Sequence, residues 1–79
     1  MKTWKQAKIA NFRKQFGGRI EEFEGFDDDR RVYINIYNLI IDALGHLPDE
    51  PHGYIKSAVT RQINADKEIL NRICEKFQD

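Results

Sequence analysis

The chain has 79 residues, enough for one domain (residues 1–79) and too few to bury a large hydrophobic core. Its 13 basic and 13 acidic residues give a net charge of zero, which argues against a protein that coats nucleic acid. Cys74 is the only cysteine, so a disulfide within the chain is excluded and a reducing, cytoplasmic setting is expected. No apolar run approaches the roughly 20 residues that cross a membrane, and the basic N-terminus lacks the apolar segment of a secretory signal.

A first helix is predicted near residues 3–16, where Ile9, Phe12 and Phe16 recur at intervals of three and four. Thr3 is in position to cap the start of this helix. The paired glycines that follow predict its end, because glycine favours a helix stop.

A block of positive charge precedes a block of negative charge. Residues 1–19 carry six bases and no acid, and residues 20–29 carry six acids and no base. The layout predicts either a charge match within the chain or a basic arm that is available to an anionic partner. We expect the acidic block to be an extended connector between the first two helices.

The segment that follows permits two interpretations. As a strand, it would belong to a small β-hairpin at about 19–37, and the fold would be α+β. As a helix near 28–46, it keeps apolar residues at intervals of four and three, with Val32 and Ile36 facing inward. We favour the helix, because three contiguous apolar residues further on break the strand register. A second apolar stripe runs beside the first and consists of Tyr33, Tyr37, Ile40 and Leu44.

Three aspartates and two arginines open this predicted helix. Asp27, Asp28 and Asp29 are typical of a capped helix start, where carboxylates accept free N–H groups and suit the helix dipole. Three consecutive aspartates cannot all face one ion from such a position, so no metal site is predicted here. Arg30 and Arg31 fall in the first turn, within reach of these and other acids.

A long last helix is predicted near 51–77, with Pro51 in its first turn and Asp49 as its cap. It would form an antiparallel hairpin with the preceding helix. Asp66 completes the heptad pattern of its apolar residues, and it either lies at an edge, bonds to a neighbouring arginine or tyrosine, or fixes the register between packed helices. The apolar members of the pattern are Val59, Ile63, Leu70, Ile73 and Phe77.

No catalytic or cofactor motif stands out. His46, Asp49, Glu50 and His52 lie close together, but the spacing of the two histidines matches no standard zinc site, and a polar turn explains them better. A nucleophile elbow and a phosphate-binding loop are both missing from the sequence. We therefore predict that the protein is not an enzyme and holds no cofactor or metal.

Cationic and aromatic residues supply the only ligand signal, because such residues hold phosphates and stack on bases. Trp4 could also anchor an interface, a role for which tryptophan is enriched. The candidate partner- or anion-binding residues are Trp4, Lys5, Lys8, Arg13, Lys14, Arg30, Arg31, Tyr33 and Tyr54.

The stretch "ALGHLPDEPHGYIKSAVT", read as two helices joined by a proline-containing turn, resembles the helical hairpins of phage proteins that sequester cyclic oligonucleotide signals. The tryptophan- and alanine-rich end of the second helix in that family is absent here. The resemblance therefore assigns no role to any residue.

These observations predict an all-α domain of three helices with a C-terminal antiparallel hairpin. The last helix is long for so small a core, so we expect a homodimer with a helical interface. The predicted function is that of a non-catalytic interaction protein, an adaptor, inhibitor or regulator, that binds a protein partner and no membrane. The alternative is a nucleotide or nucleic-acid binder, for example a phage-type sequestering protein, that uses the cations of the first helix with Arg30 and Arg31.

Overall fold

A computed structural model of the protein describes residues 1–77. It confirms the all-α fold with three α-helices and adds two short 3-10 helices. The elements in chain order are α1 (Trp4–Phe16), η1 (Gly17–Phe23), α2 (Asp27–Gly45), α3 (Gly53–Cys74) and η2 (Glu75–Phe77).

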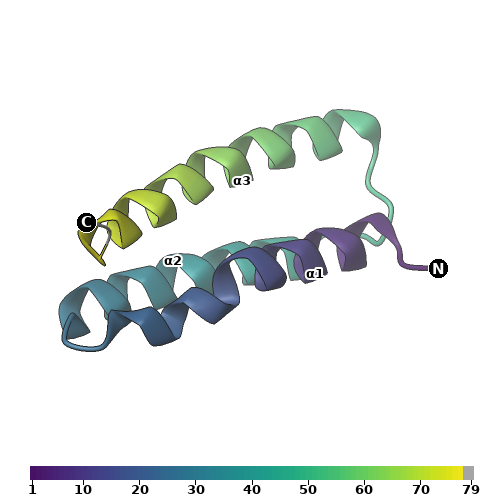
Figure 1. Cartoon of the computed structure of the whole chain (residues 1–79). Coiled ribbons are helices and arrows are strands. Elements are labelled where there is room, and N and C mark those ends of the chain that lie inside the picture. The colour runs from purple at the N-terminus through teal and green to yellow at the C-terminus, as the bar shows by residue number, and fades with distance from the viewer. Residues whose placement is uncertain (78–79) are drawn as a thin grey trace.

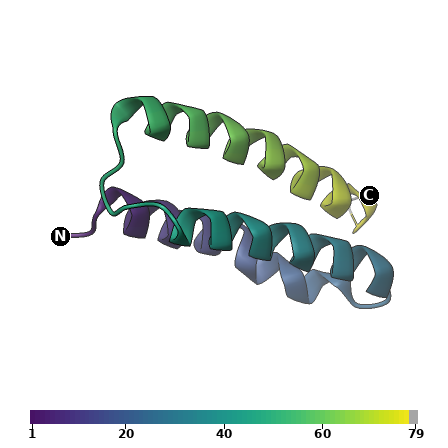
Figure 2. The ribbon, with the colours of Figure 1, turned by 180° about the vertical axis from the view of Figure 1, so that it is seen from behind.

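Helix α2 is the centre of the fold, because α1, η1 and α3 all pack against it. Helix α1 and η1 run along one side of α2, and the chain then reverses to form α2 itself (Figure 1). Helix α3 returns antiparallel to α2, which confirms the predicted hairpin (Figures 1 and 2). The result is an elongated body of 41 × 22 × 20 Å.

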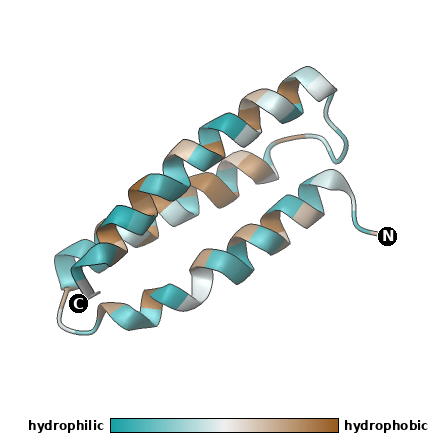
Figure 3. Cartoon of the chain, turned by 45° about the horizontal axis from the view of Figure 1, so that its top comes forward, coloured by the Kyte–Doolittle hydropathy of each residue, from teal (hydrophilic) through white to brown (hydrophobic). Residues whose placement is uncertain are grey.

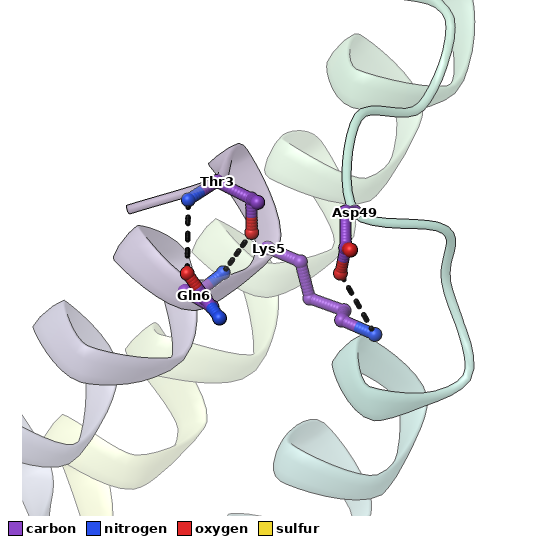
Figure 4. A network of polar contacts seen from close by, with 4 residues as sticks. All are labelled: Thr3, Lys5, Gln6 and Asp49. Atoms are coloured by element: carbon purple, nitrogen blue, oxygen red, sulfur yellow. Dashed lines mark hydrogen bonds and ion pairs between the residues drawn. The ribbon is translucent and has the colours of Figure 1, made fainter. Parts of the chain in front are cut away.

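Helix α1 begins with a reciprocal cap, as predicted for Thr3. The backbone N–H of Gln6 donates to Thr3 Oγ1 at 3.2 Å, and the backbone N–H of Thr3 donates to Gln6 Oε1 at 3.0 Å (Figure 4). Lys5 ties this end of α1 to the turn between α2 and α3. Lys5 Nζ lies 3.4 Å from the Asp49 carboxylate (Figure 4), and the backbone N–H of Lys5 donates to the Asp49 carbonyl at 3.1 Å.

The acidic connector is helical, so the prediction of an extended segment was wrong. The strand interpretation of 19–37 was wrong as well, since residues 1–77 contain no strand. A 3-10 helix has three residues per turn, which brings Ile20 and Phe23 to the same side against α2. Gly17 permits a close approach, because a Cβ there would lie 3.1 Å from the Tyr37 hydroxyl. Gly25, with φ 88°, then adopts the left-handed conformation that reverses the chain.

The start of α2 differs from the prediction in one respect. Asp27, Asp28 and Asp29 occupy its first turn, where their charge suits the helix dipole. The N-cap position belongs to Phe26, and no side chain forms the capping hydrogen bond. Asp29 instead accepts a hydrogen bond from Lys76 Nζ at 2.8 Å, which ties the start of α2 to η2.

Helix α3 starts two residues later than predicted and has 22 residues. Pro51 lies before the helix, and His52 holds the N-cap position without a side-chain cap bond. The expected cap, Asp49, is engaged by Lys5 instead. The side chain of Phe77, the last member of the predicted stripe, lies outside the described part of the structure.

The core of the described residues is built around aromatic rings from α1, η1 and α2. The centroids of Phe12 and Phe16 lie 5.2 Å apart, those of Phe12 and Tyr37 lie 5.1 Å apart, and those of Phe23 and Tyr33 lie 4.9 Å apart. Such ring pairs contribute more than their buried area alone. The buried residues of this core, among those described, are Phe12, Phe16, Phe23, Tyr33, Ile40, Leu44, Ile63, Leu70 and Cys74.

The orientation of α2 corrects the prediction that Val32 faces inward, whereas Ile36 is half-buried and packs against the core as expected. The core uses the neighbouring stripe, in which Tyr33 is 0% exposed, whereas Val32 is 48% exposed. The Tyr33 hydroxyl donates a 2.7 Å hydrogen bond to the Phe16 carbonyl. That carbonyl ends α1, where the last helical carbonyls need partners from outside the helix. The bond therefore fixes both the end of α1 and the rotation of α2.

We expect the Tyr33→Phe variant to lose about 1–2 kcal/mol of unfolding free energy, because the buried Phe16 carbonyl loses its donor. Urea unfolding followed by circular dichroism measures this loss. The control Tyr54→Phe removes a hydroxyl from a side chain that is 85% exposed and should change stability by less than about 0.5 kcal/mol. Equal effects of the two variants would contradict the assigned role of Tyr33.

Candidate functional site

Tyr33, one of the nine candidate binding residues, belongs to the core. Its ring is buried against Phe23, so it is not available to stack on a ligand. The sequence pattern had already put Tyr33 in an apolar stripe, and the structure shows that this stripe is the covered one.

The candidates at the start of α1 form a small cluster around Trp4. Lys8 Nζ and Lys56 Nζ lie 5.5 Å and 5.9 Å from the centre of the half-buried indole ring, within the range of cation–π contacts. Lys56 also lies 3.6 Å from the Glu50 carboxylate, and Lys5 pairs with Asp49. Two of the three lysines therefore face carboxylates of the α2–α3 turn, which reduces the positive charge that this end presents.

The remaining candidates do not join this cluster. Arg30 and Arg31 are exposed at the start of α2, at the opposite end of the molecule from the start of α1 (Figure 1). Neither arginine forms an ion pair with another residue in the range 1–77. Arg13 and Lys14 are exposed in the last turn of α1, and Tyr54 is exposed at the start of α3. The structure thus spreads the predicted cationic set along the molecule.

A different site emerges between α2 and α3. An apolar groove of about 500 Å³ runs between these helices, with Ile40 and Ile63 among the core residues that reach it. Its wall on α2 includes Ile36, Leu39 and Ala43, and its wall on α3 includes Val59, Asp66 and Ile69. Hydrophobic positions recur along both helices (Figure 3).

The groove belongs to a larger surface, which we call the open face. On α2 it is the stripe that was expected to face inward, and Leu39 within it is 67% exposed. On α3 it is a stripe adjacent to the buried one, and Ile69 within it is 47% exposed. Its α2 members are Val32, Ile36, Leu39, Ala43 and Leu47, and its α3 members are Ile55, Val59, Gln62, Asp66, Ile69 and Ile73. Four of these, Ile36, Leu47, Val59 and Ile73, are half-buried and also pack against the core.

One polar pair lies in the middle of the open face. Gln62 Nε2 donates a hydrogen bond of 3.2 Å to Asp66 Oδ1, one helical turn away. The partner of Asp66 is therefore an amide of its own helix, and not the arginine or tyrosine that one interpretation of the sequence proposed. Asp66 is only half-buried, so its carboxylate retains access to donors from outside the chain.

Within residues 1–77, no group of three or more histidine, cysteine, aspartate or glutamate side chains is placed to hold a metal ion. Among the described helices, none has the length and apolar character needed to cross a membrane. The open face consists of apolar side chains and one carboxylate–amide pair.

Two buried groups have shifted proton affinities. Burial raises the pKa of the Tyr33 hydroxyl well above its usual value, and the neighbouring Cys74 adds to this effect. Burial likewise raises the pKa of the Cys74 thiol. A thiol with a raised pKa forms less thiolate, so Cys74 is a poor nucleophile as well as a buried one.

We expect the free energy of unfolding to fall as the pH rises above about 9, since the unfolded chain releases the protons of Cys74 and Tyr33 before the folded chain does. Stability from these groups is complete below their ordinary pKa values and is lost above them. Urea unfolding between pH 7 and pH 11 measures the decline. The Tyr33→Phe variant should show a smaller decline above about pH 10, and an unchanged decline would contradict the assignment.

No protein-family model, no curated protein and no solved structure matches the sequence. The open face combines exposed large apolar residues, an antiparallel pair of helices and a central polar pair.

Proposed function

We propose that the protein is a small, non-catalytic interaction protein that self-associates through the open face of α2 and α3. The observation that carries this proposal is the exposure of Leu39 and Ile69 on either side of an apolar groove. The role of an adaptor, inhibitor or regulator fits such a protein, since each works by covering a surface of another chain.

Exposed apolar area on the open face favours association. Val32, Leu39 and Ile69 each leave about half or more of their surface in water, at 48%, 67% and 47%. Complete burial of such a side chain contributes about 1.5–3 kcal/mol, so covering the partly exposed face favours association. Monomeric soluble proteins seldom leave a contiguous apolar patch of this kind uncovered.

The geometry favours a helical partner. Apolar positions follow intervals of three and four along both α2 and α3, as in helices that pack side by side in bundles. Helices α1 and η1 cover α2 from the other side. The hairpin therefore resembles half of a four-helix bundle, and a second pair of helices would complete it.

The alternative proposal, a nucleotide or nucleic-acid binder, receives less support. Its aromatic candidate Tyr33 is buried, and its cations are divided between the Trp4 end and the Arg30 end. Lys5 is additionally paired with Asp49. A single surface that gathers these groups is not formed by the described residues.

Light scattering tests the proposal. We expect the wild-type protein to have twice the mass of the 9.3 kDa chain at micromolar concentration. The Leu39→Glu variant should dissociate at least about tenfold more readily, because a buried unpaired carboxylate is costly. Leu39 lies outside the core, so circular dichroism should show an unchanged helix content.

Tyr54→Glu is the matched control. It also places a carboxylate at an exposed large side chain, but one that lies about 100° around α3 from Ile55 of the open face. We expect this variant to keep the mass of the wild type. A monomeric wild type, or a Leu39→Glu variant with unchanged association, would contradict the proposed function.

A further inference from the structure

From the pattern of the open face, we infer that its occupant is a second copy of this chain, with α3 packed antiparallel on α3 of that copy around a two-fold axis near residue 64. Gln62 of each copy then lies opposite Asp66 of the other. The inference rests on the proposed self-association and adds its geometry.

The α3 stripe of the open face has the same spacing, and the same order of apolar and polar residues, in both directions along the helix. Successive members are separated by four, three, four, three and four residues. Antiparallel helices align such a stripe with its own reverse, so apolar residues meet apolar residues and the polar pair meets the polar pair. The resulting pairs are Ile55 with Ile73, Val59 with Ile69, and Gln62 with Asp66.

Hydrogen bonding supports the central pair. The Gln62 amide nitrogen carries two hydrogens, and its bond to Asp66 of the same helix uses one of them. A carboxylate accepts several hydrogen bonds, so Asp66 can accept a second one from Gln62 of the other copy. Four side chains, two from each copy, would then form a closed polar network at the two-fold axis.

A parallel arrangement of the two α3 helices is unfavourable. Parallel packing places each residue opposite its own counterpart, and Asp66 of one copy would face Asp66 of the other. Two like charges at short range in a partly buried interface repel each other. The antiparallel register avoids this repulsion because it pairs each carboxylate with an amide donor.

Packing of α3 on α2 of the second copy is also less favourable. The α2 stripe consists of apolar side chains, including Ile36, Leu39 and Ala43, and supplies no donor to Asp66. A carboxylate against such a surface loses its hydration without gaining a hydrogen bond. In the proposed arrangement, α2 instead meets α2 of the second copy, so the apolar stripes cover each other.

The size of the surface agrees with a dimer. The α3 stripe from Ile55 to Ile73 is about 27 Å long at 1.5 Å per residue. Two helices side by side give a strip about 20 Å wide, so the projected area is on the order of 500 Å², and the corrugated accessible surface is larger. This is the order of the roughly 800 Å² that each partner buries in a stable interface.

Two charged variants test the register. In one, Gln62→Lys and Asp66→Lys make the central positions positive, and in the other, Gln62→Glu makes them negative beside the native Asp66. Each variant alone should self-associate about tenfold or more weakly than the wild type, because like charges face each other across the axis. An equimolar mixture should recover association as a heterodimer, which native mass spectrometry distinguishes by mass.

Two measurements complete the experiment. The Glu68→Lys variant reverses a charge on the side of α3 away from the open face, and it should form a homodimer as the wild type does. Circular dichroism should show folded helices in all variants, since neither Gln62 nor Asp66 belongs to the core. Heterodimers that form only in the mixture support contact between the two central pairs. A Gln62→Lys variant that self-associates more tightly than the wild type then supports the antiparallel register, because its lysine faces Asp66 and not another lysine. A dimeric wild type whose charged variants fail to pair would overturn the register only, whereas a monomeric wild type would overturn the proposed function itself.

Discussion

The hydrogen bond from the Tyr33 hydroxyl to the Phe16 carbonyl decides which side of α2 becomes the core. It is 2.7 Å long, fully buried, and joins residues 17 positions apart in the sequence. Once Tyr33 points toward the end of α1, the stripe that contains Val32 and Leu39 has to point away from α1. The open face is therefore a consequence of how α1 and α2 meet.

The same constraint gives the molecule its asymmetry. Helix α1 and η1 cover one side of α2, where the aromatic rings gather, and a groove remains between α2 and α3. Within residues 1–77, no further helix covers this groove. Asp66 and Gln62 are informative for this reason, because a polar pair in the middle of an apolar surface restricts the partners and registers that fit it.

Helix number, helix positions and the antiparallel hairpin were predictable, because intervals of three and four residues are a local property of the chain. Thr3 was identified correctly as a cap on the same basis. Asp49 was assigned to the wrong helix, since the lysine that engages it comes from α1. The 3-10 conformation of η1 was missed, because the packing of Phe23 against Tyr33, and not a local pattern, stabilises it. The groove left one signal in the sequence, the presence of two apolar stripes on α2, of which the core uses only one in full.

The amino-acid sequence by itself determined an all-α fold with two apolar stripes on its central helix. Only the tertiary structure decided which stripe is buried and which is open to a partner. The physical reason is that adjacent stripes on one helix are nearly equal in hydrophobicity and spacing, so local preference does not separate them. A long-range contact, the one between Tyr33 and Phe16, makes the choice.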